Sequence, residues 1–248
     1  MAAALGASSC LAGPVPFKDA VSGDDDHTIS PTEEYADIIS AMPTTTIGAG
    51  YLMRQCQGAW LPHQRVRGLL SFQRRFTPRP DDVLLASPPK CGTTWLKALS
   101  FATMARAAYP PGDDGHPLLR LNPHDCVPLV DDLFSAGQEA KLDALPSPRL
   151  MNTHLHHSLL PPSVAQNPGC KIVYVCRFSD LFENACEGKH VNDPIWDNIL
   201  GYWQASKASR ERVLFLRYKE MLRDPVGKVR ELAQFLGVGI EPTLSPWR

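Results

Sequence analysis

The sequence predicts an α/β fold with three layers, in which a central parallel sheet is flanked by helices. Short apolar runs rich in β-branched residues alternate with longer stretches of helix formers along most of the chain. One of these runs enters a tight, glycine-containing loop that opens directly into a helical stretch. Strands that alternate with helices pair in parallel, so the order of the elements favours a single parallel sheet.

Four apolar runs have the length and composition of buried strands. Cys170–Cys176 reads CKIVYVC and is continuous, β-branched and apolar, as a strand covered on both faces should be. Val83–Leu85 and Val213–Leu216 are shorter runs of the same kind, and Arg149–Leu155 is a fourth candidate. Every run is too short to cross a bilayer, so we expect no membrane span.

Helix formers without a breaker predict helices between these strands. Thr93–Ala108 follows the first strand and stops before Pro110. Ile195–Ser206 has apolar residues at the spacing of one helix face, and a short helix is expected near Gln138–Leu142. The last predicted helix runs to Leu236, with Asp224 as its cap, Pro225 in its first turn and Gly237 after its end.

The composition indicates one globular domain behind a loose leader. A chain of 248 residues with a hydrophobic share of 44% can bury one sizeable core. Residues 1–45 are rich in small and polar residues without a sustained period, so we expect a flexible leader there and the domain in 46–248. The formal net charge of −1 gives no overall field that would recruit nucleic acid or an anionic membrane, so any anion site must be local.

The cysteines and the N-terminal residues indicate a reducing compartment. The seven cysteines are scattered, odd in number and never spaced as Cys-x-x-Cys, which argues against a disulfide framework and a zinc ribbon. The first residues have neither the basic start nor the apolar stretch of a secretory signal, and no arginine precedes Arg54. We therefore expect a cytoplasmic protein.

The loop Pro88–Trp95 has the chemistry of a phosphate site. A strand, a glycine-containing turn and a helix N-terminus direct several backbone N–H groups to one point, where the helix dipole adds partial positive charge. Lys90 supplies a full charge, Gly92 lets the backbone approach an anion closely, and Thr93 and Thr94 add hydroxyl donors. The loop is not a Walker A sequence, because Lys90 precedes Gly92. A helix N-terminus with an incidental lysine is the alternative interpretation.

This loop and several later segments resemble the cytosolic sulfotransferases, and their plant branch in particular. Those enzymes use 3′-phosphoadenosine 5′-phosphosulfate (PAPS) as the sulfuryl donor. The resemblance covers about residues 50 to 240, and its motifs occur in the family's order. The matching segments are Pro89–Leu99 (PKCGTTWLKAL), Arg149–Pro161 (RLMNTHLHHSLLP), Gly169–Arg177 (GCKIVYVCR), Leu200–Trp203 (LGYW) and Val213–Pro225 (VLFLRYKEMLRDP).

The resemblance implies a binding site for PAPS. It implies that the loop holds the 5′-phosphosulfate, that Trp95 lies near the adenine, and that Arg177 binds the 3′-phosphate as a planar bidentate donor. Judged from the residues alone, Arg177 can also cap the sheet edge by pairing with Asp180. The implied donor ligands are Lys90, Cys91, Gly92, Thr93, Thr94, Trp95 and Arg177.

The resemblance also implies two catalytic residues, His154 and Lys90. His154 would take the proton of the acceptor hydroxyl at neutral pH, and Lys90 would stabilise the oxygen that joins sulfate to phosphate. From the residues alone, His154 can instead be structural, or can form a metal site with His156 and His157, although no cysteine or carboxylate lies at ligand spacing. The resemblance requires no metal, and it leaves His156 and His157 to line the acceptor pocket or face solvent.

The chain departs from the family pattern after Arg177. The family has a serine eight residues after this arginine, where this chain has Ala185, and Phe182–Gly188 resembles a segment that normally lies further downstream. We therefore expect that a block of residues is missing after Asp180. The chain also stops at Arg248, before the Arg-Lys-Gly loop and the tail that carries the usual dimer contact, so an incomplete domain is expected and the oligomeric state stays open.

Three functions are compatible with these residues. The first is sulfuryl transfer from PAPS to a hydroxyl of a small-molecule acceptor, of the flavonoid, phenol, hydroxy-jasmonate or steroid class. The second is a catalytically impaired or non-catalytic relative that binds nucleotide or acceptor. The third is nucleotide hydrolysis or phosphoryl transfer, against which the position of Lys90 and the lack of an acidic residue closing either apolar strand both argue. The first is the expectation, with PAPS as co-substrate and with no metal, nucleic acid or membrane partner.

Overall fold

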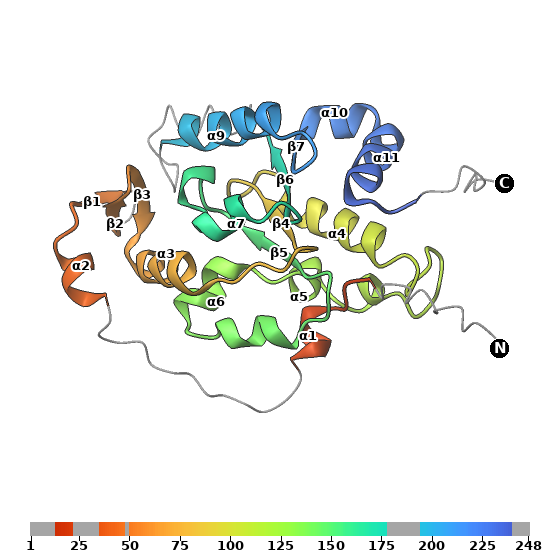
Figure 1. Ribbon diagram of the computed structural model, residues 1–248, viewed down its shortest axis with the longest axis horizontal. Coiled ribbons are helices and arrows are strands. Elements are labelled where there is room, and N and C mark those ends of the chain that lie inside the picture. The colour runs from red at the N-terminus through yellow and green to blue at the C-terminus, as the bar shows by residue number, and fades with distance from the viewer. Residues whose placement is uncertain (1–12, 22–34, 48–49, 178–193, 240–248) are drawn as a thin grey trace, which may run out of the picture.

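The computed structural model describes residues 13–21, 35–47, 50–177 and 194–239. At its centre lies a four-stranded sheet in the order β5-β4-β6-β7, and each neighbouring pair of strands is parallel (Figure 1). These strands are the four apolar runs that the sequence predicts, so the central parallel sheet is confirmed. Their bounds are β4 Val83–Ala86, β5 Leu150–Thr153, β6 Lys171–Cys176 and β7 Val213–Arg217.

Each face of the sheet is covered by its own set of helices. Successive side chains of a strand point to opposite faces, and in β4 the side chains of Leu84 and Ala86 join one apolar cluster while those of Val83 and Leu85 join another. The predicted three layers are therefore present. The first cluster includes side chains of α3 (His63–Arg75), α6 (Val130–Ser135) and α9 (Ile195–Ala208), and the second includes side chains of α4 (Thr93–Met104), α10 (Tyr218–Arg223) and α11 (Pro225–Leu236).

The predicted helix boundaries are close to the observed ones. Helix α4 begins at Thr93 as expected and ends at Met104, four residues before the predicted end. At the start of α11 the carboxylate of Asp224 accepts a hydrogen bond from the backbone N–H of Gly227 at 2.9 Å, which is the expected N-terminal cap. Gly237 ends α11 with a φ of 79°, in the left-handed region that favours glycine.

Helices α3 and α6 pack closely because of one glycine. A Cβ atom on Gly68 would lie 2.1 Å from the hydroxyl oxygen of Ser135 and 2.7 Å from its backbone nitrogen. Below this contact the rings of Phe72 and Phe134 meet with their centroids 4.9 Å apart. The two helices therefore pack as a unit beside β5, which α6 contacts directly.

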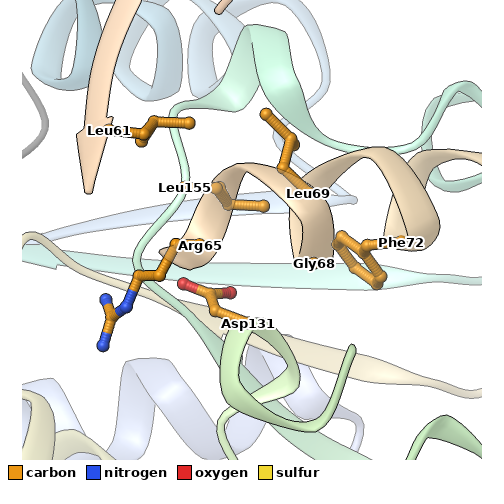
Figure 2. Close-up of a pocket in the computed structure, with 7 residues that line it drawn as sticks. All are labelled: Leu61, Arg65, Gly68, Leu69, Phe72, Asp131 and Leu155. Atoms are coloured by element: carbon orange, nitrogen blue, oxygen red, sulfur yellow. The ribbon is translucent and has the colours of Figure 1, made fainter. Parts of the chain in front are cut away.

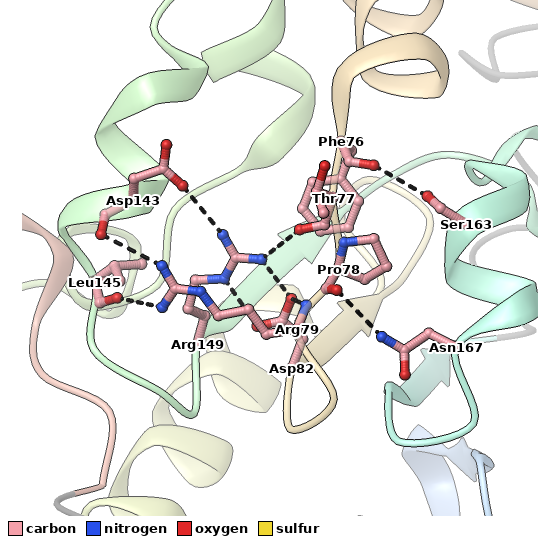
Figure 3. A network of polar contacts seen from close by, with 10 residues as sticks. All are labelled: Phe76, Thr77, Pro78, Arg79, Asp82, Asp143, Leu145, Arg149, Ser163 and Asn167. Atoms are coloured by element: carbon pink, nitrogen blue, oxygen red, sulfur yellow. Dashed lines mark hydrogen bonds and ion pairs between the residues drawn. The ribbon is translucent and has the colours of Figure 1, made fainter.

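A buried ion pair ties together the residues that enter β4 and β5 (Figure 3). The guanidinium of Arg149 donates to both carboxylate oxygens of Asp82, at 2.9 and 2.6 Å, and to the carbonyl of Thr77 at 2.9 Å. Arg149 is 3% exposed and Asp82 is fully buried. The backbone N–H of Arg79 also donates to Asp82, so every charge in this cluster is matched by several hydrogen bonds.

The first part of the domain forms a second, antiparallel sheet that the sequence analysis did not predict. It has the order β1-β2-β3. A two-residue turn joins β2 to β3, and both of its residues, Gln57 and Gly58, have positive φ. The bounds are β1 Thr44–Ile47, β2 Tyr51–Cys56 and β3 Ala59–Pro62.

Two stretches of the expected leader pack on the domain. In α1 (Phe17–Ala20), the Asp19 carboxylate pairs with Arg120, and Phe17 lies against the core. In the second stretch Tyr35 and Ile39 are buried, the latter within α2 (Ala36–Ser40). These stretches differ from the expectation of a flexible leader, because each supplies apolar side chains to the core. Residues 1–12 and 22–34 lie outside the described part.

Short helices complete the cover. The short helix expected near Gln138–Leu142 is present as the 3-10 helix η2. Across the described ranges, no helix has the length and apolar character needed to cross a membrane. The remaining bounds are η1 Pro117–Leu119, α5 Pro123–Cys126, η2 Glu139–Ala144, η3 His157–Leu159 and α7 Pro162–Gln166.

Candidate functional site

The polar residues singled out in the sequence gather at the carboxyl ends of the parallel strands. Lys90 lies in the loop after β4, His154 follows β5 directly and Arg177 follows β6 directly. The register places Ala86 beside both Thr153 and Tyr174, so these strand ends are neighbours. In open parallel sheets this edge is where ligands bind.

The loop between β4 and α4 adopts an unusual backbone shape. Lys90 has a φ of 64° and Gly92 a φ of 96°, so two of three consecutive residues are in the left-handed region. The Lys90 side chain is exposed, whereas Cys91 between them is buried and its N–H donates to the Pro88 carbonyl. Such alternation turns backbone N–H groups toward one side and, at the start of a helix, makes a concave site for an anion.

Tyr218 holds one side of this loop. A Cβ atom on Gly92 would lie 2.8 Å from the Tyr218 ring, so only glycine fits there without a shift. The Trp95 ring packs edge-on against Tyr218 with centroids 5.7 Å apart, and the Arg177 guanidinium lies 5.4 Å from the centroid of the same ring. Tyr218 therefore connects three of the predicted donor residues. The sequence analysis did not single it out, although its position directly after β7 was a usable signal.

The two threonines of the loop have different surroundings. The Thr93 hydroxyl is buried and shares a 2.6 Å hydrogen bond with the Ser87 hydroxyl, which fastens the first turn of α4 to the end of β4. Thr94 is exposed, and its hydroxyl oxygen lies 3.0 Å from Nε2 of His124. Thr94 is thus the threonine whose hydroxyl faces the open side of the loop.

His154 is held in a defined orientation by its neighbours. Its Nδ1 lies 2.7 Å from the Ser87 carbonyl oxygen, and because a carbonyl can only accept, Nδ1 carries the proton of the neutral ring and Nε2 carries the lone pair. Its backbone N–H donates to the Asp131 carboxylate at 2.9 Å, and the Thr153 hydroxyl donates to the same carboxylate at 2.6 Å. Burial lowers the pKa of His154 although Asp131 opposes the shift, so the ring is neutral at pH 7. Nε2 has the properties of a general base.

The other two histidines of the Thr-His-Leu-His-His segment do not join His154 in a metal site. His156 is 2% exposed, and the His157 ring packs edge-on against Tyr202 with centroids 5.3 Å apart. Burial lowers the pKa of His157. Within the described ranges no group of three His, Cys, Asp or Glu side chains has the arrangement needed to hold a metal ion.

A small, mostly apolar pocket adjoins the candidate base (Figure 2). Leu155, which follows His154, and the Asp131 carboxylate that fixes His154 both line it, between α3 and α6. Figure 2 shows the Arg65 side chain and the Asp131 carboxylate at the same end of the pocket. Its other lining residues are Leu61, Gly68, Leu69 and Phe72.

The cysteines of the described ranges are buried thiols without disulfide bonds. They are Cys56, Cys91, Cys126, Cys170 and Cys176. Burial raises the pKa of Cys170 and of Cys176 to about 12, and that of Cys126 to about 11. These three stay protonated at neutral pH and are poor nucleophiles.

Two predictions cannot be compared with the structure. Asp180, Ala185 and Phe182–Gly188, where a block of residues is expected to be missing, lie outside the described residues. The chain end at Arg248 does too.

Comparison with known proteins gives matches over most of the chain. The family profile described as "Sulfotransferase domain" matches residues 80–177 and 178–245. Cytosolic sulfotransferase 8 of Arabidopsis thaliana is 37% identical over 231 residues, which cover 83% of this chain and 69% of that protein. Cytosolic sulfotransferase 12 of the same plant is 37% identical over 237 residues, covering 84% and 72%.

Solved structures agree with these matches. A putative steroid sulphotransferase of Arabidopsis thaliana superposes with a TM-score of 0.77 and 37% identity, over 88% of this chain and 82% of that one. The mouse sulfotransferase SULT7A1 complexed with PAP has a TM-score of 0.56 and 22% identity, over 77% and 70%, and shows a shared fold. With this fold and with the predicted motifs in place, the chain belongs to the sulfotransferase family, whose enzymes use PAPS as the sulfuryl donor.

Proposed function

We propose that this chain transfers a sulfuryl group from PAPS to a hydroxyl of a small-molecule acceptor in the cytoplasm. One observation carries the proposal. Ser87 accepts a hydrogen bond from the base candidate His154 and stands three residues before Lys90. The segment that carries the candidate anion site thus also fixes the candidate base through a hydrogen bond, which keeps the two close together, as transfer between two bound substrates requires.

The donor is proposed to lie across the loop and the ends of β6 and β7. The 5′-phosphosulfate would be held by Lys90, by the Thr94 hydroxyl and by the N–H groups of the loop and first helical turn. Arg177 would bind the 3′-phosphate, and Trp95 and Tyr218 would flank the adenine side, since the three residues form one cluster. The proposed donor residues are Lys90, Cys91, Gly92, Thr93, Thr94, Trp95, Arg177 and Tyr218.

The transfer step is proposed to need one base and one cation. The acceptor oxygen forms a bond to sulfur while Nε2 of His154 takes the hydroxyl proton. The bond from sulfur to the bridging oxygen breaks, its electrons remain on the 5′-phosphate of the leaving nucleotide, and Lys90 stabilises the charge that develops there. A neutral His154 at pH 7 suits this role, because a protonated ring has no lone pair to offer.

The acceptor is proposed to be an apolar molecule with a hydroxyl, of the flavonoid, phenol, hydroxy-jasmonate or steroid class. The apolar side chains of Leu61, Leu69, Phe72 and Leu155 beside the His154 segment support this class, and the cavity of about 10 Å³ that they line must open to admit such a molecule. The relative with the 0.77 TM-score is itself described as a putative steroid sulphotransferase.

A catalytically impaired relative that binds nucleotide or acceptor is the second candidate. One observation favours it: the family profile matches in two segments that meet between residues 177 and 178, next to the proposed 3′-phosphate ligand Arg177. Loss of a single hydrogen bond to a charged phosphate weakens binding by about 1.5–3 kcal/mol, or about ten- to a hundredfold. A chain that lacks some of the residues that bind the donor phosphates would keep the loop at Lys90 and would bind the nucleotide more weakly.

Radiolabelled PAPS with a panel of phenols, flavonoids, hydroxy-jasmonates and steroids tests the first candidate. We expect label on at least one acceptor, and we expect adenosine 3′,5′-bisphosphate (PAP) to bind in calorimetry. PAP binding without transfer to any acceptor would support the impaired relative. If neither transfer nor PAP binding is measured, both the enzyme and the nucleotide-binding proposals are wrong.

A further inference from the structure

A chain of hydrogen bonds runs from the interior of the protein to the open side of the anion loop. The Lys97 ammonium lies 2.9 Å from the Val127 carbonyl oxygen and 3.1 Å from Nδ1 of His124. Nε2 of the same ring lies 3.0 Å from the Thr94 hydroxyl oxygen. Lys97 and Thr94 belong to α4, His124 belongs to the adjacent α5, and the two helices are in contact (Figure 1).

The chemistry of these groups fixes the direction of every bond in the chain. A protonated lysine can only donate, so Nδ1 of His124 must accept from it. The neutral ring then carries its proton on Nε2, which donates to the Thr94 oxygen. With that oxygen accepting, the Thr94 proton is left to point elsewhere. Thr94 is exposed in the first turn of α4, beside Lys90 and the N–H groups of the loop.

We propose that Lys97 and His124 are positioning residues, which form a one-way relay that presents the Thr94 hydroxyl as a hydrogen-bond donor to the phosphosulfate. This inference rests on the proposed function and deepens it. Through these hydrogen bonds, the buried Lys97 ammonium fixes the orientation of the Thr94 hydroxyl without contacting the ligand itself. Because the hydrogen bond from His124 already fixes the orientation of the Thr94 hydroxyl, less conformational entropy is lost when the anion binds.

The charges around the relay keep it in this direction at neutral pH. Burial lowers the pKa of Lys97 to about 8, while Asp131 and Asp132 of α6 favour its charged form, so the ammonium persists at pH 7. Burial and the charges of Lys97 and Lys90 lower the pKa of His124, while the neighbouring Asp125 raises it, so its ring is neutral there. Above pH 8, Lys97 gains a lone pair and can accept from Nδ1. The relay can then reverse, and Thr94 then donates inward to His124.

A purely structural role for Lys97 and His124 predicts different behaviour. In that case the two side chains only join α4 to α5, and their removal lowers stability without a selective effect on the nucleotide. His124 is exposed, so its replacement leaves little buried surface unfilled. The two roles are therefore separable by measuring ligand affinity and melting temperature on the same variants.

Calorimetry with PAP on the full chain and on His124→Phe at pH 7 is the main test. We expect about tenfold weaker binding, the loss of roughly one hydrogen bond to a charged group, at an unchanged melting temperature. His124→Gln should restore affinity, because its amide also accepts with one atom and donates with the other. His63→Phe is the matched control, since His63 is an exposed histidine bonded to Arg54, and should bind PAP as the parent does.

Two further readouts separate a relay from a simple contact. Thr94→Val should weaken binding at least as much as His124→Phe does, and the double variant should be no weaker than Thr94→Val alone, because the relay acts only through that hydroxyl. Affinity of the parent should fall between pH 7 and pH 9, whereas His124→Phe should show a flat profile over the same interval.

Each outcome has a distinct consequence. If the parent binds PAP and His124→Phe binds it equally well, the relay is wrong while the proposed function stands. Additive effects of the two substitutions, or failure of His124→Gln to restore affinity, also overturn the relay. If the parent itself does not bind PAP, the proposed donor site fails first and the relay falls with it.

Discussion

The two ends of the parallel sheet use charged residues in opposite ways. At the amino end, Arg149 and Asp82 form a buried pair in which each charge meets its opposite and several further hydrogen bonds (Figure 3). At the carboxyl end, the groups are mostly cationic or basic, and Lys90, His154 and Arg177 come together from three strand ends. The first arrangement leaves no net field, whereas the second leaves a site that favours an anion.

The backbone conformation also differs between the two ends of the sheet. The residues that enter β4 and β5 have no positive φ and are held by side-chain bonds to main-chain carbonyls, such as Arg79 to Leu145 at 2.7 Å. The exit from β4 holds Lys90 and Gly92 at positive φ, and for the non-glycine residue Lys90 this costs free energy that the rest of the fold must offset. We therefore expect stability to depend more on the amino end of the sheet and the proposed ligand binding on the carboxyl end. Substitutions at the two ends should give separable losses.

The largest expected effect is on catalysis, from a change at the carboxyl end. His154→Asn keeps an N–H near the position of Nδ1 that can donate to the Ser87 carbonyl, but it removes the base. We expect the rate of transfer to fall by about 10²–10⁴-fold, with PAP affinity and melting temperature nearly unchanged. Single-turnover rates and calorimetry measure the two separately. A variant that keeps most of its rate would show that His154 is not the base.

The largest expected effect on stability is at the amino end. Arg149→Met leaves the Asp82 carboxylate buried without its cation, which should lower the free energy of unfolding by about 3–5 kcal/mol. Arg120→Met is the matched control, because Arg120 pairs with Asp19 on the surface and solvent already screens that pair. Urea denaturation of both variants checks the difference. Equal losses would mean that burial does not distinguish the two pairs.

Gly92→Ala tests whether a change of backbone conformation in this loop weakens nucleotide binding as well as stability. The new Cβ would sit at a φ of 96° and 2.8 Å from the Tyr218 ring, so the loop or the ring must shift. We expect a stability loss of about 1–2 kcal/mol together with weaker PAP binding. Gly112→Ala has the same backbone cost at a φ of 88° but meets nothing within 4 Å, so it should lose stability alone. Calorimetry showing equal PAP affinity for the two variants would count against the loop as the phosphate site.

The pH dependence of the transfer rate should reflect the lowered pKa of the buried His154 ring. Because burial lowers the pKa of His154, the ring loses its lone pair to protonation only below its ordinary value of about 6.5. The rate should therefore be level near pH 7 and fall on acidification with a midpoint below 6.5. A pH profile of the single-turnover rate measures this limb. A midpoint at or above 7 would indicate that a different group, or a charged histidine, controls the step.

The smallest expected effect lies far from the nucleotide loop. Asp224→Ala removes the side-chain acceptor for the Gly227 N–H at the start of α11 and should lower the free energy of unfolding by about 1 kcal/mol. PAP affinity should not change, and Asp224→Asn should recover most of the loss. Thermal melting of the two variants, with PAP calorimetry beside it, checks both statements.

Local patterns were sufficient to predict the main sheet and the strand, loop and helix on which the candidate site lies. The CKIVYVC run, the strand–loop–helix at 83–104 and the capped helix that ends at Gly237 are all present with nearly the predicted bounds. The antiparallel sheet of β1 to β3 was not predicted, because its strands have exposed and mixed side chains and a Gln-Gly turn without the usual asparagine or aspartate. The packing of Phe17 and Ile39 was also missed, since short apolar segments carry no signal of the distant surface they cover.

The sequence alone determined the parallel sheet, the strand, loop and helix around Lys90 and the family to which the chain belongs, because each depends on residues adjacent along the chain. Tertiary structure alone decided which side chains surround that loop. The Asp131 carboxylate binds the His154 N–H across 23 positions, His124 contacts Thr94 across 30, and Tyr218 packs on Gly92 from the start of α10. Such contacts depend on how the helices pack over the sheet, and packing joins residues whose separation in the chain leaves no periodic or local pattern to read.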